Sequence, residues 1–367
     1  MNPLLIMSLV VIIVVFGGHL FLWSTLVKFY AIESLYWRYG LLAVIIVLLL
    51  ILAAALWLKL PNNNFWTNFH VGAFWWIGIL ANLLIFSTLT WIIWFSASRL
   101  NCPVNSPILI SVMLGLSLLI SIIGLINAAH PAIVNLDLSL PNLPEAWKGK
   151  KIVQLSDMHY GAINNDDYLQ KITNIVNGLH PDLIVYTGDL FDGTGGAGPN
   201  FASIINQMKA TSGSYFVFGN HETYFGMDEV NKLLAETNLK VLRDQKVDLN
   251  GLQLVGLDGW NFNGRSDLAQ VFTKINLDKN KPSILLYHIP ANVPEIKAAG
   301  INLWLAGHTH RGQLWPFNWL VTLIYKGYGH GLFQDKNFIT YVSAGVGTWG
   351  PPMRTSGRPE IVVVNLK

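Results

Sequence analysis

The sequence predicts a helical membrane region followed by an α/β domain with either a mixed sheet or two packed sheets. Three observations support this division. Residues 1–130 contain four basic residues and one acidic residue, so about 4% of them are charged, against about 17% of residues 131–367. The long apolar stretches all lie in the first part. The second part alternates between short apolar runs and segments with helical spacing of apolar residues, which is typical of α/β domains.

Four apolar stretches in the first part are each long enough to cross a bilayer as a helix, which takes roughly 20 residues. They comprise residues 3–23, 41–58, 74–95 and 108–128. Polar or turn-forming residues separate them, and Trp and Tyr gather near their ends, as they do at membrane–water interfaces. The sequence therefore predicts an integral protein of a bacterial-type inner or plasma membrane, with four spans and the lipid bilayer as its partner.

The basic residues between these stretches bear on the orientation of the chain, because cytoplasmic loops are enriched in Lys and Arg. The loops after the first and third stretches carry Lys28, Arg38 and Arg99, whereas the loop after the second carries Lys59 alone. A lysine cluster at 148–151 favours the opposite orientation, but it lies about 20 residues beyond the last stretch, where charges count little. We expect the second part of the chain to face away from the cytoplasm.

The composition excludes several classes of protein. A mean hydropathy of +0.42 excludes a disordered chain. The net charge of +3 is small and dispersed, so we expect no nucleic-acid partner. Cys102 is the only cysteine, which excludes an internal disulfide framework and a cysteine-based zinc site.

The second part begins with residues 131–150, whose prolines and alternating apolar residues predict an extended lead-in strand and linker. Short apolar runs then predict strands at 151–155, 183–186, 215–218, 252–257, 283–287, 302–305, 339–343 and 361–365. Helical spacing predicts helices at 167–177, 201–208 and 228–236. We therefore expect a transmembrane region at 1–130, a linker at 131–150 and a domain at 151–367.

Five of these strands are followed directly by side chains that can bind metal ions. The motifs are Asp157-Met-His159, Gly188-Asp189-Leu-Phe-Asp192, Gly219-Asn220-His221-Glu222, Tyr287-His288 and Gly307-His308-Thr-His310. In α/β folds, ligands bind at the carboxyl ends of the strands. Carboxylate, imidazole and amide donors without a thiolate suit Mn²⁺, Fe or Zn²⁺. The sequence thus predicts a metal site at this edge.

The order of the motifs resembles that of the calcineurin-like metallophosphoesterases, over roughly residues 150–367. Residues 345–354 and 312–316 look like the membrane-anchored branch of that family. The resemblance implies a four-layer α/β/β/α sandwich. It also implies two divalent metal ions, with Mn²⁺ expected first and Fe or Zn²⁺ as alternatives, in an arrangement suited to in-line phosphoryl transfer.

The resemblance also implies residue roles. The metal ligands would be Asp157, His159 and His310 for one ion, Asn220, His288 and His308 for the other, and Asp189 as a bridge between both. A hydroxide shared by the metals would attack phosphorus. His221 would protonate the leaving oxygen, and Asp192 would fix the tautomer of His221 and raise its pKa.

These roles predict a hydrolase acting on ester bonds, namely a membrane-bound phosphoesterase for phosphate mono- or diesters, lipid-linked ones included. One alternative is a pyrophosphohydrolase that acts on a nucleotide-linked acyl sugar such as UDP-diacylglucosamine. Another alternative is a non-catalytic membrane sensor whose phosphoesterase domain only binds ligands.

Several further residues carry weaker expectations. Glu222 is expected to support a loop, and His180 to lie in a surface turn. Arg311 and Arg354 are expected either to clamp a phosphate or to remain solvated. Residues 315–325 are too apolar for a plain exposed connection, so they are expected either to join the core or to contact the bilayer or a lipid tail.

Overall fold

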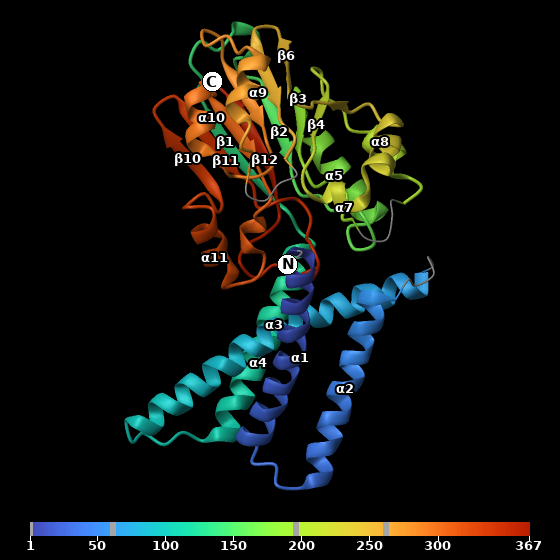
Figure 1. The fold of residues 1–367 in the computed structure, drawn as a ribbon, viewed down its shortest axis with the longest axis vertical. Helices are drawn as coiled ribbons and strands as arrows, with labels where there is room; N and C mark the ends of the chain where they lie inside the picture. Colours follow the sequence, from blue (N-terminus) through green and yellow to red (C-terminus); the bar gives the residue numbers. More distant parts are fainter. Residues whose placement is uncertain (1–2, 59–63, 194–197, 260–263) are drawn as a thin grey trace. The chain divides into compact units, whose positions relative to one another are not determined.

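The computed structural model describes residues 3–58, 64–193, 198–259 and 264–367, excluding the side chains of residues 3–14, 56, 57 and 64 (Figure 1). The chain divides into two compact units. One comprises residues 1–126 with 350–353, and the other comprises residues 127–349 with 354–367.

The first unit is helical. Its helices are α1 (Pro3–Phe29), α2 (Leu35–Trp57), α3 (Asn64–Arg99) and α4 (Ser106–Ala128). Three segments of the described residues are long and apolar enough to cross a membrane: Leu35–Ala55, Phe65–Arg99 and Ser106–Ala129. The first predicted span, residues 3–23, falls within α1, but most of its side chains lie outside the described residues. Three of the four predicted spans are therefore supported.

The ring of His19, which lies within α1, has hydrogen-bond partners on both nitrogens. Trp76 Nε1 donates to His19 Nε2 at 3.0 Å, and His19 Nδ1 lies 2.7 Å from the carbonyl oxygen of Val15. A polar group in an apolar helical region needs such partners, because none come from lipid. The contacts explain why a histidine is tolerated here.

The second unit contains two six-stranded sheets, as the sequence allowed. The first has the order β1 (Ala132–Leu138), β12 (Glu360–Leu366), β2 (Lys151–Leu155), β3 (Leu183–Thr187), β4 (Ser214–Val217) and β5 (Lys240–Val241). The second has the order β10 (Gly331–Asp335), β11 (Phe338–Val342), β9 (Leu303–Ala306), β8 (Ser283–Leu286), β7 (Leu252–Gly256) and β6 (Gln245–Leu249). Strands β2, β3 and β4 are parallel, and so are β7, β8 and β9. Their carboxyl ends therefore meet at one edge of each sheet.

The expected lead-in strand is a full member of the first sheet. It forms β1, which pairs in parallel with β12 so that Ala132 lies opposite Glu360. A short 3-10 turn, η1 (Glu145–Trp147), then leads to β2.

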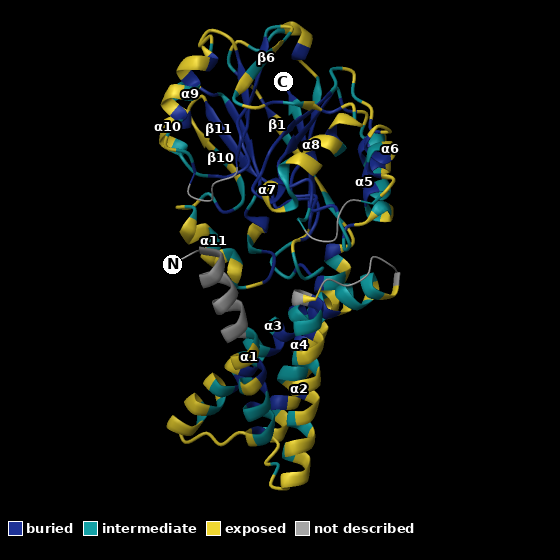
Figure 2. Ribbon diagram, turned by 45° about the vertical axis from the view of Figure 1, so that its right-hand side comes forward, coloured by how far each residue is buried: buried dark blue, intermediate teal, exposed yellow. Residues whose placement is uncertain are grey.

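Helices cover the outer faces of both sheets (Figure 2). On the first sheet they are α5 (Asp166–Gly178), α6 (Phe201–Ile205) and α8 (Met227–Ala235), and on the second they are α9 (Leu268–Ile275) and α10 (Val293–Ala299). The short helix α7 (His221–Phe225) follows β4, and α11 (Phe317–Ile324) has no buried residue. The predicted helices at 167–177, 201–208 and 228–236 correspond to α5, α6 and α8, with α6 shorter than predicted.

Strand β3 shows how the layers are built. Leu183 and Val185 face the core between the sheets, whereas Ile184 and Tyr186 face the core under α5. Successive side chains of a strand point to opposite faces, so a strand covered on both sides is apolar throughout. A third core, under α9 and α10, covers the outer face of the second sheet. The polar ends of the central strands are thus the places where chemistry can occur.

Candidate metal centre

The residues that the sequence singled out lie together at the carboxyl ends of the parallel strands. Those of the first sheet follow β2, β3 and β4, and those of the second follow β8 and β9. All except His308 are buried, and they comprise Asp157, His159, Asp189, Asn220, His221, His288, His308 and His310. Buried ionisable groups at this density need partners of opposite charge or a bound ion.

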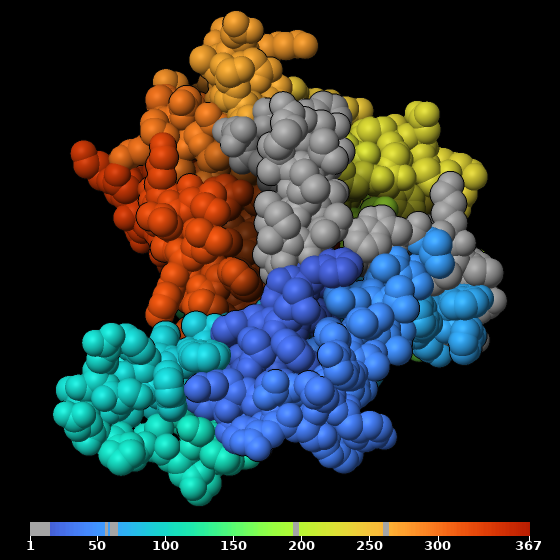
Figure 3. Space-filling view, turned by 60° about the horizontal axis from the view of Figure 1, so that its bottom comes forward, coloured from blue at the N-terminus to red at the C-terminus, as the bar shows by residue number. Residues whose placement is uncertain are grey.

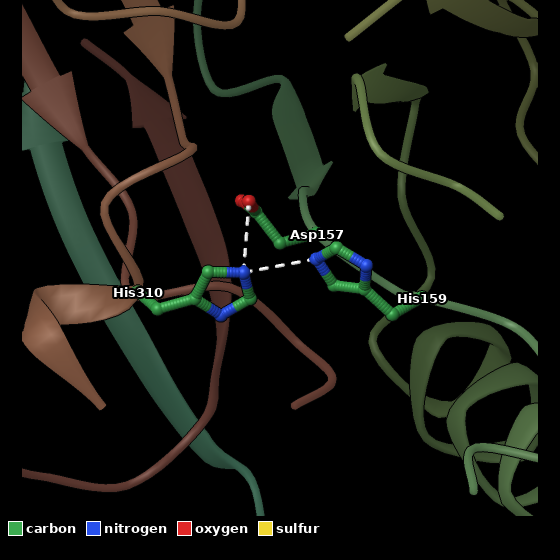
Figure 4. A group of neighbouring side chains, drawn as sticks. All are labelled: Asp157, His159 and His310. Atoms are coloured by element: carbon green, nitrogen blue, oxygen red, sulfur yellow. Dashed lines mark hydrogen bonds and ion pairs between the residues drawn. The ribbon is translucent and has the colours of Figure 1, made fainter. Parts of the chain in front are cut away.

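The first group joins the end of β2 to the loop after β9. Figure 4 shows Asp157, His159 and His310 pointing toward one another. His310 Nε2 lies 2.9 Å from His159 Nε2 and 3.4 Å from Asp157 Oδ1. Burial raises the pKa of Asp157 to about 6. Two imidazoles and one carboxylate converging on a point form a set that a divalent ion can occupy.

The second group joins the ends of β3, β8 and β9. His288 Nε2 lies 2.9 Å from Asp189 Oδ2 and 3.3 Å from His308 Nδ1. His288 Nδ1 lies 2.7 Å from the carbonyl oxygen of Thr187, which can only accept, so Nδ1 carries a proton and Nε2 faces the group.

Asp189 lies between the two groups. Its Oδ2 is 4.0 Å from His159 Nε2 in one group and 2.9 Å from His288 Nε2 in the other. Asp189 Oδ1 accepts the main-chain N–H of His221 at 2.8 Å. Asp189, His159 and His221 form a third set of possible ligands. The Asp189 carboxylate therefore lies between His159 of the first group and His288 of the second.

Among the residues that the structure describes, two buried polar atoms of the centre have no hydrogen-bond partner. They are Asn220 Oδ1 and His159 Nδ1. The Asn220 side chain follows β4 and is 1% exposed. An unpartnered buried amide oxygen costs free energy unless a ligand satisfies it. Together with the carboxylate and imidazole donors, this oxygen makes the residues fit divalent metal ions.

The backbone is held in an unfavourable conformation at most of these positions. A left-handed φ occurs at Asp157 (52°), His159 (47°), Asp189 (54°), His308 (71°) and His310 (49°). Each such residue costs on the order of 1–3 kcal/mol and persists only where its surroundings hold it. Main-chain bonds do so here, since the N–H groups of Asp157 and His159 donate to Gly188 and Asp189 at 3.0 Å. Strain concentrated at five ligand positions is typical of a functional site.

Two glycines make room for the carboxylates. A Cβ at Gly219 would overlap Asp189 Oδ1, and a Cβ at Gly307 would overlap Ser156 Oγ and Asp157 Oδ2. Any side chain at Gly219 or Gly307 would therefore clash with these atoms, so both positions require glycine.

The histidines differ in charge. Burial alone would lower the pKa of His288, but attraction to Asp189 outweighs it and raises that pKa to about 9. Burial alone would raise the pKa of Asp189, but the same attraction holds it well below its usual value. Burial lowers the pKa of His308 to about 3, and it lowers those of His159 and His310 well below the usual value. The last three rings are thus neutral at pH 7 and can donate a lone pair to a cation.

Glu222 supports the centre, as the sequence suggested, and does so more extensively than spacing alone indicates. It is fully buried, and its carboxylate accepts the main-chain N–H groups of Asp189, Leu190, Phe191 and Gly219 at 2.7–3.3 Å. Burial, followed by repulsion from Asp189, raises its pKa to about 7. It therefore joins the loops after β3 and β4.

His221 and Asp192 are in contact, but not through the atoms that the sequence suggested. His221 Nδ1 lies 2.7 Å from the main-chain carbonyl oxygen of Asp192, while the Asp192 carboxylate lies 3.7 Å from His159 Nδ1. The expectation that the carboxylate orients His221 is corrected accordingly. The carbonyl oxygen fixes the tautomer of His221, and the carboxylate faces His159.

The remaining candidates divide between buried and exposed positions. Arg354 is 1% exposed and donates to the carbonyl oxygen and to Nδ1 of His310, both at 3.0 Å, so it braces a ligand loop. Burial lowers its pKa to about 10. Arg311 and His180 are exposed, and His180 lies in the turn after α5. Most of residues 315–325 form the exposed helix α11, whereas Tyr325 packs against the core of the second sheet.

Comparisons with known proteins agree with this geometry. A family model described as calcineurin-like phosphoesterase matches residues 150–312. An uncharacterized metallophosphoesterase of Campylobacter jejuni is 32% identical over 385 aligned positions, which cover 99% of this chain and 98% of that protein. An uncharacterized metallophosphoesterase of Helicobacter pylori is 35% identical over 60% of each chain. A Danio rerio protein named transmembrane protein with metallophosphoesterase domain is 33% identical, covering 68% of this chain and 60% of that protein.

These matches confirm the resemblance that the motifs indicated, and the family implies a phosphoesterase hydrolase that uses divalent metals. Since the similarity to the Campylobacter jejuni protein extends over nearly all of both chains, this chain belongs to the calcineurin-like metallophosphoesterase family.

Proposed function

We propose that the chain is a membrane-bound phosphoesterase that uses two divalent metal ions to hydrolyse a phosphate mono- or diester. The observation that carries the proposal is the place of Asp189 between two separate groups of ligands. Two cations close together repel each other and need a shared anion between them. Asp189 would supply that anion.

Each group would hold one ion. The ligands would be Asp157, His159 and His310 for the first, Asn220, His288 and His308 for the second, and Asp189 for both. When bound, the ions would supply Lewis acidity, which lowers the pKa of water and neutralises charge on the phosphate oxygens. We propose Mn²⁺ first, with Fe or Zn²⁺ as alternatives, because oxygen and nitrogen donors without sulfur suit all three ions.

His221 would deliver the proton to the leaving oxygen. Its Nδ1–H donates to the carbonyl oxygen of Asp192, which leaves Nε2 available for a substrate. The rings of Tyr224 and Trp349 lie with their centroids 5.0 and 5.8 Å from that of His221, and both side chains are about half exposed. They would flank the leaving group where it departs.

We propose that the substrate is lipid-linked. We also propose that residues 1–130 form four membrane spans, that residues 131–150 are a linker, and that residues 151–367 form a four-layer α/β/β/α domain. The support is the presence of apolar spans in the same chain as the metal centre. The domain would face away from the cytoplasm. Fusions at Lys367 would test this, because alkaline phosphatase gains activity only when it is exported, whereas green fluorescent protein fluoresces when it stays inside.

The reaction can be tested on the full chain purified in detergent. Lipid, nucleotide and aryl phosphate esters would be assayed with added Mn²⁺, alongside the variants Asp189→Asn and Asp137→Asn. Asp137 is an exposed residue of β1, outside the centre, so its variant is the control. We expect Asp189→Asn to abolish hydrolysis and to reduce the content of both ions. Two ions at full occupancy in that variant would contradict the bridging role, and no hydrolysis by the wild type would favour the non-catalytic alternative.

A further inference from the structure

Helix α11 exposes an unusual amount of apolar surface. None of its eight residues is buried. Leu323 is 78% exposed and Trp319 is 66% exposed, and Phe317, Leu320 and Ile324 are about half exposed. Figure 2 shows the helix largely in the colour of exposed residues, and in Figure 3 the orange-red part of the chain that includes it lies at the surface. Clustered exposed apolar side chains of this kind mark an interaction surface.

The helix is held firmly by the domain at both ends. A Cβ at Gly312 would overlap the main chain of Phe317 and Asn318, and a Cβ at Gly329 would lie 2.5 Å from Thr322 Oγ1, so both ends are tightly packed. After the helix, Tyr325 and Tyr328 pack against the core of the second sheet. The exposed apolar face is therefore a fixed projection of the domain.

The same projection continues directly from the metal centre. The ligands His308 and His310 come just before α11, with His310 opening the short turn η2 (His310–Gly312). Thr309 Oγ1 donates to the carbonyl oxygen of Gly329 at 2.6 Å, and the ring of Tyr325 lies 5.7 Å from that of His308. The residues directly after α11 thus contact the loop that carries both ligands.

Hydrogen bonds also connect α11 with the residues that leave the last apolar span. That span ends at Ala129, and His130 belongs to the same unit as α11. Segment 354–359 joins them. At one end Arg358 Nε donates to the carbonyl oxygen of His130 at 2.9 Å, and at the other the N–H of Trp315 donates to Thr355 Oγ1 at 2.9 Å. Thr355 and Arg358 are three residues apart, so their Cα atoms are at most about 11 Å from each other. The base of α11 therefore lies near His130, the first residue after the last apolar span, within the same unit.

The charges around α11 match a lipid surface. Residues 311–334 include no Asp or Glu, while Arg311 and Lys326 flank the helix and are exposed. Trp315 and Trp319 add amphipathic rings. Apolar and aromatic side chains flanked by basic ones are typical of helices that lie in the interface of an anionic bilayer.

We propose that α11 is an interfacial membrane helix, which buries its apolar side chains in the acyl boundary of the bilayer next to the last span. Docking of α11 would hold the His308–His310 loop, and with it the metal centre, at the level of the lipid headgroups. The docking itself does not depend on the reaction proposed above.

The test uses the full chain in vesicles of phosphatidylcholine and phosphatidylglycerol. The native cysteine is removed by Cys102→Ser, and a single environment-sensitive NBD label is placed by Leu323→Cys or by Lys274→Cys as the control. Both side chains are exposed, so neither substitution disturbs a core. Lipids carrying a doxyl quencher in their acyl chains then report contact with the bilayer.

We expect the label at Leu323 to emit at shorter wavelength in vesicles and to be quenched at least about twofold more strongly than the label at Lys274, given burial of 5–10 Å for interfacial helices. Equal quenching at both positions would overturn the proposal. A shift of emission without quenching would also overturn it, since the helix would then be covered by protein. These readouts need no catalytic activity, so failure of the proposed reaction would leave this test unaffected.

Discussion

The substitution Glu222→Gln tests whether a single carboxylate holds the metal centre together. Glu222 Oε1 accepts the N–H groups of Leu190 and Phe191, and Oε2 accepts those of Asp189 and Gly219. A glutamine keeps one oxygen and replaces the other by an NH₂ group, which only donates. Whichever way the amide is oriented, two buried N–H groups lose their acceptor.

The expected magnitude follows from that count. Each unsatisfied buried donor costs about 1–3 kcal/mol, so the variant should lose about 2–6 kcal/mol of folding free energy. For a domain of this size, 1 kcal/mol shifts Tm by roughly 2–4 °C, so Tm should fall by about 4–24 °C.

The assay is calorimetry of the detergent-solubilised full chain at pH 8 with a metal chelator. At that pH, Glu222, whose pKa is raised to about 7, is ionised in the wild type. The chelator separates the effect on folding from loss of metal. The matched control is Glu229→Gln on α8, because the Glu229 side chain is exposed. If the Tm of Glu222→Gln stays within about 2 °C of that of the control, the inferred role is wrong.

Three further predictions concern the histidines. His221→Ala should keep its metal and slow hydrolysis by about 10²–10⁴-fold for esters with poor leaving groups, and by less for activated aryl esters; equal losses in a steady-state comparison would refute the role of His221 in protonation. Asp192→Asn should leave the dependence of the rate on the leaving group unchanged, because His221 is hydrogen-bonded to the main-chain oxygen of residue 192. It should weaken metal binding about 10-fold, because the Asp192 carboxylate lies beside the ligand His159. Titration with a chelator measures this loss. Metal affinity should fall about tenfold for each pH unit below about 9, because the ion must displace a proton from His288, whose pKa Asp189 raises to about 9. If the affinity measured by titration calorimetry does not change between about pH 6 and 9, this prediction is wrong.

The sequence was sufficient for the strands and for the clustering of the motif residues. Each motif directly follows an apolar run, so the parallel order of β2, β3 and β4 brings its polar residues to one edge. It was not sufficient for contacts that depend on individual atoms. The bond from His221 to the carbonyl oxygen of Asp192, in place of the carboxylate, reflects the turn after β3, which side-chain chemistry alone does not reveal. The four bonds of Glu222 likewise depend on how two loops meet in space.

The sequence was also not sufficient to predict which strands pair when they lie far apart along the chain. Residues 131–150 were expected to be a lead-in strand and linker, and the partner of the strand, β12, lies more than 200 residues further along the chain. Nothing local indicates that pairing. Similarly, the apolar spacing of residues 315–325 is compatible with a core helix or an exposed one, and only tertiary structure shows that α11 is exposed.

The pairing of β1 with β12 has a consequence for biosynthesis. Strand β12 lies between β1 and β2, so the first sheet stays divided until residues 360–366 have been translated. Until then β1, which emerges directly after the last apolar span, has an open edge that can pair with other chains. Its attachment to a membrane helix limits how freely it can meet them. The order of synthesis thus makes the last strand the step that completes the first sheet, and a ribosome that stops before residue 360 would leave β1 without its partner.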